Sequence, residues 1–170
     1  AAAQALIDGP NQYPPSKGLA VLRQAVSAHA AKFYGLTYDP EDEVVITSGG
    51  TEAITGALMA MAGAGDEVVM IEPTYDSYRP MVEASGAVVK IVKLEPPGWR
   101  LTETGLRAAI APRTRAVLIN TPYNPTGRVF GREELETLAR VVGETDAVVI
   151  CDEVYEHLTY DGKPHIPLAT

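Results

Sequence analysis

The sequence predicts an α/β fold of three layers, in which helices cover both faces of a mostly parallel sheet. Short runs rich in β-branched residues recur along the chain, and all but the last are followed by a helical pattern. Three runs have unbroken apolar cores (Val-Val-Ile, Val-Val-Met-Ile and Val-Val-Ile-Cys), as strands covered on both faces do. The 170 residues are enough for one domain with a sizeable core.

Strands and helices are expected to alternate. The β-rich runs predict strands over Glu43–Thr47, Glu67–Ile71, Ala87–Leu94, Ala116–Asn120 and Ala147–Asp152. The segments between them predict helices over Thr51–Ala62, Ser77–Ser85, Thr102–Ile110 and Arg132–Val142. Thr102 is a capping residue at one helix start, and Gly86 is a typical helix terminator. This alternation is typical of βαβ units.

The first 42 residues differ from the rest. Lys17–Tyr34 predicts an amphipathic helix, with Leu19, Leu22, Val26 and Ala30 on one stripe. We therefore divide the chain into residues 1–42, a loop and helix leading into the main domain, and residues 43–170, the main α/β domain. The polar tail has no obvious cap, and both ends look cut rather than finished.

Composition excludes several classes of protein. The 14 Lys and Arg residues against 22 Asp and Glu give a net charge of −8, and no basic patch of a nucleic-acid binder is visible. The apolar runs are far shorter than the ~20 residues of a membrane span. Cys151 is the single cysteine, which rules out a disulfide framework, and the three histidines have no thiolate partners for a zinc site. We expect a soluble, cytoplasmic, acidic protein without a metal.

The first candidate site is the segment Thr47–Glu52, with the sequence Thr-Ser-Gly-Gly-Thr-Glu. It follows an expected strand and begins an expected helix. Glycines there let backbone N–H groups approach an anion, and the helix dipole favours negative charge. An ordinary tight turn explains the pattern equally well.

The second candidate is Asn120–Gly127, which follows another strand at the edge where open α/β sheets bind ligands. Its two prolines stiffen the loop and can hold an Asn side chain in one orientation. A structural turn is the alternative, because Asn-Pro often forms turns. Two asparagines in so stiff a loop favour function.

The third candidate is Cys151–Tyr155. Asp152 ends the most apolar strand, where a carboxylate is costly unless it meets a cation or a donor. Asp152 and Tyr155 could converge on one ligand, the acid facing a ring nitrogen and the phenol a ring oxygen. A helix N-cap is the alternative for Asp152. Cys151 itself is interpreted as a small buried hydrophobe.

The fourth candidate is Glu72–Tyr78, again after a strand. An aromatic ring at a strand end can stack on a flat cofactor, although aromatic residues at such positions more often only pack.

Together these sites resemble the class I and II aminotransferases, enzymes of fold type I that depend on pyridoxal 5′-phosphate (PLP). Five motifs occur in the family's order and spacing and cover nearly the whole chain: Tyr13–Gly18, Thr47–Ala53, Glu72–Tyr75, Asn124–Gly127 and Asp152–Tyr155. The branch that contains kynurenine, methionine and N-succinyldiaminopimelate aminotransferases looks most similar.

The resemblance implies a role for each matching residue. Gly50 and Thr51 would bind the cofactor phosphate, and Tyr75 would stack on the pyridine ring. Asn124 and Tyr155 would contact the ring oxygen O3′, and Asp152 would pair with the protonated ring nitrogen. Asp152, Tyr155 and Asn124 would thus serve catalysis. Tyr13 resembles the tyrosine that reaches into the neighbouring subunit's phosphate site, which implies a homodimer.

One part of the family's pattern is absent. The family needs a Schiff-base lysine after the Asp-x-x-Tyr motif, and none of the five lysines of this chain lies in that context. We therefore interpret the chain as the cofactor-binding part of a longer aminotransferase that exchanges amino groups between an amino acid and a 2-oxo acid. A carbon–sulfur β-lyase or a related synthase on the same fold remains the alternative, as does a non-catalytic domain.

Overall fold

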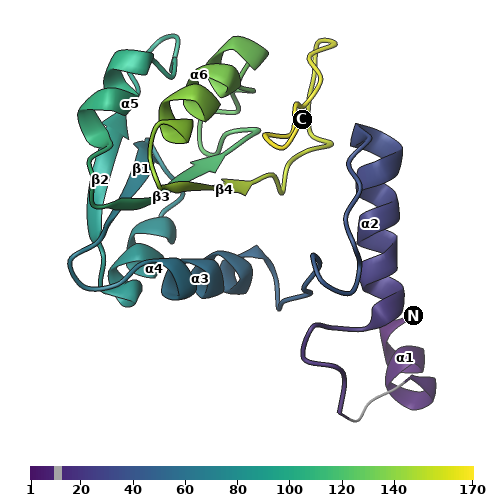
Figure 1. Ribbon diagram of the computed structural model, residues 1–170. Helices are drawn as coiled ribbons and strands as arrows, with labels where there is room; N and C mark the ends of the chain where they lie inside the picture. The colour runs from purple at the N-terminus through teal and green to yellow at the C-terminus, as the bar shows by residue number, and fades with distance from the viewer. Residues whose placement is uncertain (10–12) are drawn as a thin grey trace. The chain divides into compact units, whose positions relative to one another are not determined.

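The computed structural model of the chain describes residues 1–9 and 13–170 (Figure 1). Residues 10–12, part of the expected N-terminal loop, lie outside the described residues. The described chain divides into two compact units, Ala1–Ser48 and Gly49–Thr170. The second unit contains the sheet.

The sheet of the second unit has four parallel strands. They are β1 (Glu67–Glu72), β2 (Val88–Lys93), β3 (Thr114–Asn120) and β4 (Val148–Asp152), in the order β2-β1-β3-β4. The last four expected strands are therefore confirmed, with ends that differ by one or two residues. A parallel sheet follows from the sequence because each connection between strands contains a helix.

Two helices cover each face of this sheet, as Figure 1 shows. α3 (Gly50–Met61) and α4 (Tyr78–Ser85) lie on one face, and α5 (Glu103–Ala109) and α6 (Arg132–Gly143) lie on the other. Along β1 the side chains alternate. Val68 and Met70 pack with α3 and α4, whereas Val69 and Ile71 pack with α5 and α6. The expected α/β/α layering is confirmed, and it explains the unbroken apolar runs.

The strand order creates a crevice at the carboxyl end of the sheet. From β1 the chain turns to α4 on one face, and from neighbouring β3 it turns to α6 on the other. The two loops therefore diverge between β1 and β3, which is the point where open α/β sheets bind ligands.

Two expected helix ends are also present. Thr102 Oγ1 accepts from Gly105 N at the start of α5, and Gly86 ends α4 with φ 88°.

The first unit contains α1 (Ala2–Asp8) and α2 (Ala20–Tyr34). The expected helix start at Lys17 is wrong because Gly18 has φ 89°, and a Cβ there would lie 2.5 Å from Ile46 Cβ. The predicted apolar stripe of α2 is only partly buried: Leu22 is 46 % exposed and Ala30 is 9 % exposed. α1 was not predicted from the sequence.

The expected strand Glu43–Thr47 is also wrong. Its residues have no regular secondary structure, although Ile46 N donates to the carbonyl of Lys17 at 2.9 Å. A strand exists only by pairing, and the described residues place no strand beside this segment.

Among the described residues we find no helix with the length and apolar character that crossing a membrane requires.

Candidate functional site

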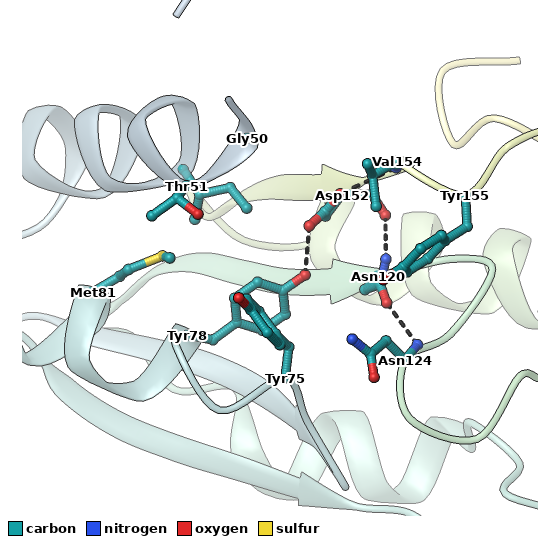
Figure 2. Close-up of a pocket in the computed structure, with 11 residues that line it drawn as sticks. Gly50, Thr51, Tyr75, Tyr78, Met81, Asn120, Asn124, Asp152, Val154 and Tyr155 are labelled. Atoms are coloured by element: carbon teal, nitrogen blue, oxygen red, sulfur yellow. Dashed lines mark hydrogen bonds between the residues drawn. The ribbon is translucent and has the colours of Figure 1, made fainter. Parts of the chain in front are cut away.

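The carboxyl ends of the strands surround a cavity of about 220 Å³ (Figure 2). Every residue that lines it belongs to the second unit. The lining comes from the start of α3, the segment from the end of β1 into α4, the end of β3 with its loop, and the end of β4 with its turn: Gly50, Thr51, Ile54, Tyr75, Tyr78, Met81, Asn120, Asn124, Asp152, Val154 and Tyr155. Six of the seven expected cofactor-binding residues are among them.

Asp152 ends β4 and is held by two donors. The hydroxyl of Tyr78 donates to its Oδ2 at 2.7 Å, and the backbone N–H of Val154 donates to its Oδ1 at 3.1 Å (Figure 2). No helix begins after Asp152, because the chain continues as a turn, so the N-cap interpretation is wrong. Both donors are uncharged, and a carboxylate has about four acceptor positions, so the group can still receive a cation from the cavity.

Tyr78 fixes the direction of this carboxylate. Its side chain is buried, and burial, followed by the hydrogen bond to Asp152 and the nearby negative charge, raises its pKa well above the ordinary value. The phenol therefore stays protonated and remains a donor across the physiological pH range. The ring of Tyr78 also meets the Tyr75 ring edge-on, with centroids 5.5 Å apart and an interplanar angle of 86°.

Asn120 joins the ends of β3 and β4. It is fully buried, and its Nδ2 donates to the Asp152 carbonyl at 2.8 Å. Its Oδ1 accepts from the backbone N–H of Asn124 at 2.7 Å. The carbonyl of Asp152 also accepts from Thr121 N at 3.0 Å. One buried amide thus sets the relative position of Asp152 and Asn124, whose own side chain is directed towards the cavity in Figure 2.

Tyr123 joins the loop after β3 to the loop after β1. Its hydroxyl donates to the carbonyl of Pro73 through a short hydrogen bond, while its N–H donates to the Arg128 carbonyl at 2.7 Å. Burial and the charge of Glu72 raise its pKa, so that this donor too remains protonated. Because Pro73 lies two residues before Tyr75, this bond helps to place the Tyr75 ring at the cavity, where it is 38 % exposed.

The first turn of α3 provides the remaining wall of the cavity. Gly49 precedes the helix with φ 82°, a conformation that glycine adopts readily, and as the N-cap residue it has no side chain with which to cap the helix. The first N–H groups of a helix have no partner within it. A Cβ on Gly50 would meet nothing within 4 Å, so the space beside these N–H groups is open to a ligand. An anion is the ligand favoured there.

The structure places the remaining expected residues as follows. Tyr155 is half-buried in the turn after β4 and lines the cavity. Tyr13 lies in the first unit, with its side chain 92 % exposed. None of the residues that line the cavity is a lysine. Cys151 is half-buried, its thiol donates to Glu153, and burial raises its pKa, as expected for a small hydrophobe.

Sequence reasoning assigned no individual role to Asn120 and Tyr78. Both belong to segments that it singled out, but their contacts depend on the strand order. Tyr78 is 74 residues from Asp152, and Asn120 is 32 residues from it. The available signal was a polar residue at the buried end of an apolar strand, which requires a partner in any folded protein.

Comparison with known proteins gives one consistent family. The family model described as "Aminotransferase class I and II" matches residues 1–169. The chain is 48 % identical over 171 residues to the probable N-succinyldiaminopimelate aminotransferase DapC of Mycobacterium tuberculosis, covering 99 % of this chain and 43 % of that protein. It is 37 % identical over 157 residues to the methionine aminotransferase of Escherichia coli, covering 92 % and 41 %.

Solved structures agree with this result. N-succinyldiaminopimelate aminotransferase from M. tuberculosis superposes with a TM-score of 0.95 at 48 % identity, over 99 % of this chain and 44 % of that one. Aspartate aminotransferase from Thermus thermophilus, solved with maleate, gives a TM-score of 0.92 at 38 % identity, over 99 % and 44 %. The chain therefore spans less than half the length of these relatives.

Proposed function

We propose that this chain, which belongs to the class I and II aminotransferase family, is the cofactor-binding part of an enzyme that transfers an amino group between an amino acid and a 2-oxo acid. One observation carries the proposal. A carboxylate, two amides, three phenols and the first turn of a helix, contributed by four separate parts of the chain, line a single cavity at the switch point of the sheet.

The residues present fit pyridoxal 5′-phosphate. The open first turn of α3, with Gly50 and Thr51, suits a phosphate group. Tyr75 offers an exposed ring for stacking, and Asn124 and Tyr155 offer polar groups for the ring oxygen. Asp152, whose own donors are uncharged, suits a protonated ring nitrogen. Bound there, the cofactor would supply an electron sink for negative charge at the substrate α-carbon.

The chain's own residues orient the polar groups of the site and exclude water from part of it. Tyr78 and Val154 hold the Asp152 carboxylate in one direction, so that it can keep a proton on a cationic partner. Asn120 holds Asn124 and Asp152 at a fixed separation. This preorganisation matters because a site already aligned for charge needs no rearrangement during the reaction. The buried ring of Tyr78 excludes water from the side of Asp152 that faces α4.

Transamination also needs a lysine that forms a covalent link to the cofactor and moves a proton. Lys90 pairs with Glu67, and Lys93 pairs with Glu95, both outside the cavity lining. We propose that the required lysine belongs to a part of the protein that these 170 residues do not include, since the relatives are more than twice as long.

The proposal extends to assembly and location. We propose a homodimer in which Tyr13 of one copy reaches the cofactor site of the other, and its exposed side chain is available for such a contact. Sedimentation analysis tests the dimer, and Tyr13→Ala should weaken cofactor binding while the dimer persists. A cytoplasmic location is consistent with a single cysteine in 170 residues, and cell fractionation tests it.

The test of the activity uses the complete protein that carries this sequence. Purified protein is incubated with PLP, 2-oxoglutarate and an amino donor, and glutamate and the new oxo acid are measured by mass spectrometry. Donors include N-succinyl-diaminopimelate, methionine and kynurenine, the substrates in the names of relatives. Borohydride reduction followed by intact-mass measurement tests for one covalently attached cofactor.

Two results would contradict the proposal. Pyruvate released from a cysteine conjugate without any oxo acid acceptor, in the absence of transfer, would indicate a β-lyase. A protein that takes up no PLP, either in the transfer assay or before borohydride reduction, would indicate a binding or structural role instead. Equal amounts of glutamate and oxo acid, dependent on both substrates, are the expected outcome.

A further inference from the structure

Glu153 lies between two residues of the site but faces away from it. Side chains alternate at the end of β4: Asp152 meets Tyr78 of the α4 layer, whereas Cys151 packs with the core under α5 and α6. Glu153 follows Cys151 to that reverse side, where its carboxylate accepts from the Cys151 thiol at 3.3 Å. It does not line the cavity, so any effect that it has on the site must act through its neighbours.

The Glu153 carboxylate binds the returning tail of the chain. Its Oε1 accepts from the backbone N–H of Leu168 at 3.0 Å, and its Oε2 lies 3.4 Å from His165 Nε2. Although burial opposes ionisation of Glu153, the contacts with His165, Leu168 and Cys151 outweigh it and lower its pKa, so the group is charged. The carboxylate therefore joins two parts of the chain that are 15 positions apart in sequence.

His165 makes this a buried contact rather than a surface pair. Its side chain is 2 % exposed, compared with 26 % for Glu153. Ile166 and Leu168, on either side of Pro167, pack against the core that α6 helps to form. The segment 158–170 has no helix or strand of its own. Its position therefore depends on these side chains, and Glu153 is the point where it meets the strand end of the site.

We propose that Glu153 and His165 are positioning residues, which hold the end of β4 and the following turn so that Asp152 and Tyr155 face the cofactor. The inference rests on the proposed function, because it assigns these two residues to the same site. Without the pair, the tail loses its attachment to residue 153, and the backbone between Asp152 and Tyr155 is held from the cavity side only. Small displacements of aligned groups are costly in such sites.

The experiment measures cofactor affinity and stability separately in the complete protein. Apo-protein carrying Glu153→Ala, His165→Ala or both changes is titrated with PLP, and its absorbance gives the dissociation constant at a temperature where every variant is folded. Each single change should weaken binding about tenfold. The double variant should bind no more weakly than either single variant, because the two residues act as one unit.

Two further variants separate positioning from general destabilisation. Glu153→Gln keeps an oxygen for the Leu168 N–H and should restore most of the affinity lost in Glu153→Ala. Glu67→Gln is the matched control. Glu67 is also a buried carboxylate with basic partners, but it lies at the start of β1, at the other end of the sheet. It should lower the unfolding midpoint and leave the dissociation constant unchanged.

The possible outcomes distinguish a positioning role from a general contribution to stability. Weaker binding in the single variants, rescue by Glu153→Gln and unchanged binding in Glu67→Gln support the proposal. Unfolding midpoints that fall while PLP affinity stays at the wild-type value overturn it, as does strictly additive loss in the double variant. If Glu153→Ala does not fold, His165→Ala and Glu153→Gln decide in the same way. Failure of the wild-type protein itself to bind PLP would contradict the proposed function instead.

Discussion

Two carboxylates lie at opposite ends of the same parallel sheet, and they are held in opposite ways. Glu67, at the start of β1, is 2 % exposed and its Oε1 meets Arg113 at 3.0 Å and Lys90 at 3.5 Å. Asp152, at the end of β4, meets a phenol and a backbone N–H. Among the described residues, no ion pair joins Asp152 to a cation. The charge of Glu67 is neutralised by its own chain, whereas the two donors that hold Asp152 are both uncharged, as we expect of a group that meets a cationic ligand.

The difference indicates what each end of the sheet is for. At the amino end, Glu67 Oε1 is paired with Arg113 and Lys90 of the same chain, so we expect Glu67 to contribute to stability. At the carboxyl end, diverging loops leave a cavity, and buried donors orient groups that remain able to bind. The comparison therefore predicts that substitutions at the two ends affect different measured quantities.

The largest expected effect is on activity, at Asp152. Asp152→Ala in the complete protein should reduce kcat by about 10²- to 10³-fold, because the site loses the charge that opposes a cationic group. The unfolding midpoint should change little, since the carboxylate is only half-buried and has no charged partner in the described structure. Steady-state kinetics and denaturant titration measure the two quantities. A variant that transaminates at a near wild-type rate would show that Asp152 has been assigned wrongly.

At the other end, Glu67→Gln should reverse this pattern. The change removes the negative charge that Arg113 and Lys90 share, and the cost should be about 2 kcal/mol of unfolding free energy. The cost stays moderate because both basic side chains are partly exposed and can be hydrated again. Urea titration measures the effect. A fall in kcat comparable to that of Asp152→Ala would contradict the separation between the two ends.

The sequence predicted the four strands of the sheet well because their apolar runs need cover on both faces. The same reasoning failed for Val44–Ile46, which is an unbroken apolar run like those of the strands in the sheet. What that segment lacks among the described residues is a neighbouring strand, and pairing is a property of the fold and not of the segment. The helix start at Ala20 was missed for a related reason, because Gly18 adopts a positive φ where it packs against Ile46.

The cavity brings together several residues that the sequence singled out. Four polar or aromatic residues at or shortly after strand ends stand out locally: Tyr75, Asn124, Asp152 and Tyr155. Tyr78 does not, since its role depends on α4 lying opposite the end of β4, which follows from the strand order alone. Residues that orient others are therefore the part of a site that local sequence reasoning recovers least.

Tyr78→Phe tests one of these orienting residues. The change removes the donor to Asp152 Oδ2 and keeps the buried ring, so stability should be nearly unchanged. The activity should fall about tenfold, as expected for loss of a hydrogen bond to a charged group. Kinetics of Tyr78→Phe and of Asp152→Ala/Tyr78→Phe provide the check. In the double variant the tyrosine change should cost almost nothing further, and an additive loss would mean that Tyr78 acts independently of Asp152.

The smallest expected effect concerns a carboxylate that is well paired but exposed. Glu103, at the start of α5, accepts from Arg140 and from Arg107, and Arg107 also binds Glu144. Hydrogen bonds from Arg140 and then Arg107 lower the Glu103 pKa to about 2 from 4.5. All of these side chains are substantially exposed, so water and salt screen the pairs.

Glu103→Gln therefore adds an exposed carboxylate to the comparison between Glu67 and Asp152. Because the folded-state pKa is lowered, the stability gained from Glu103 is fully present above about pH 4.5 and is lost as the pH falls towards 2. The urea midpoints of wild type and Glu103→Gln should differ slightly at neutral pH and converge over that range. The difference should also shrink in 1 M salt. If Glu103→Gln instead destabilised the protein more than Glu67→Gln does, the number of charged partners, and not burial, would determine what a carboxylate contributes to this fold.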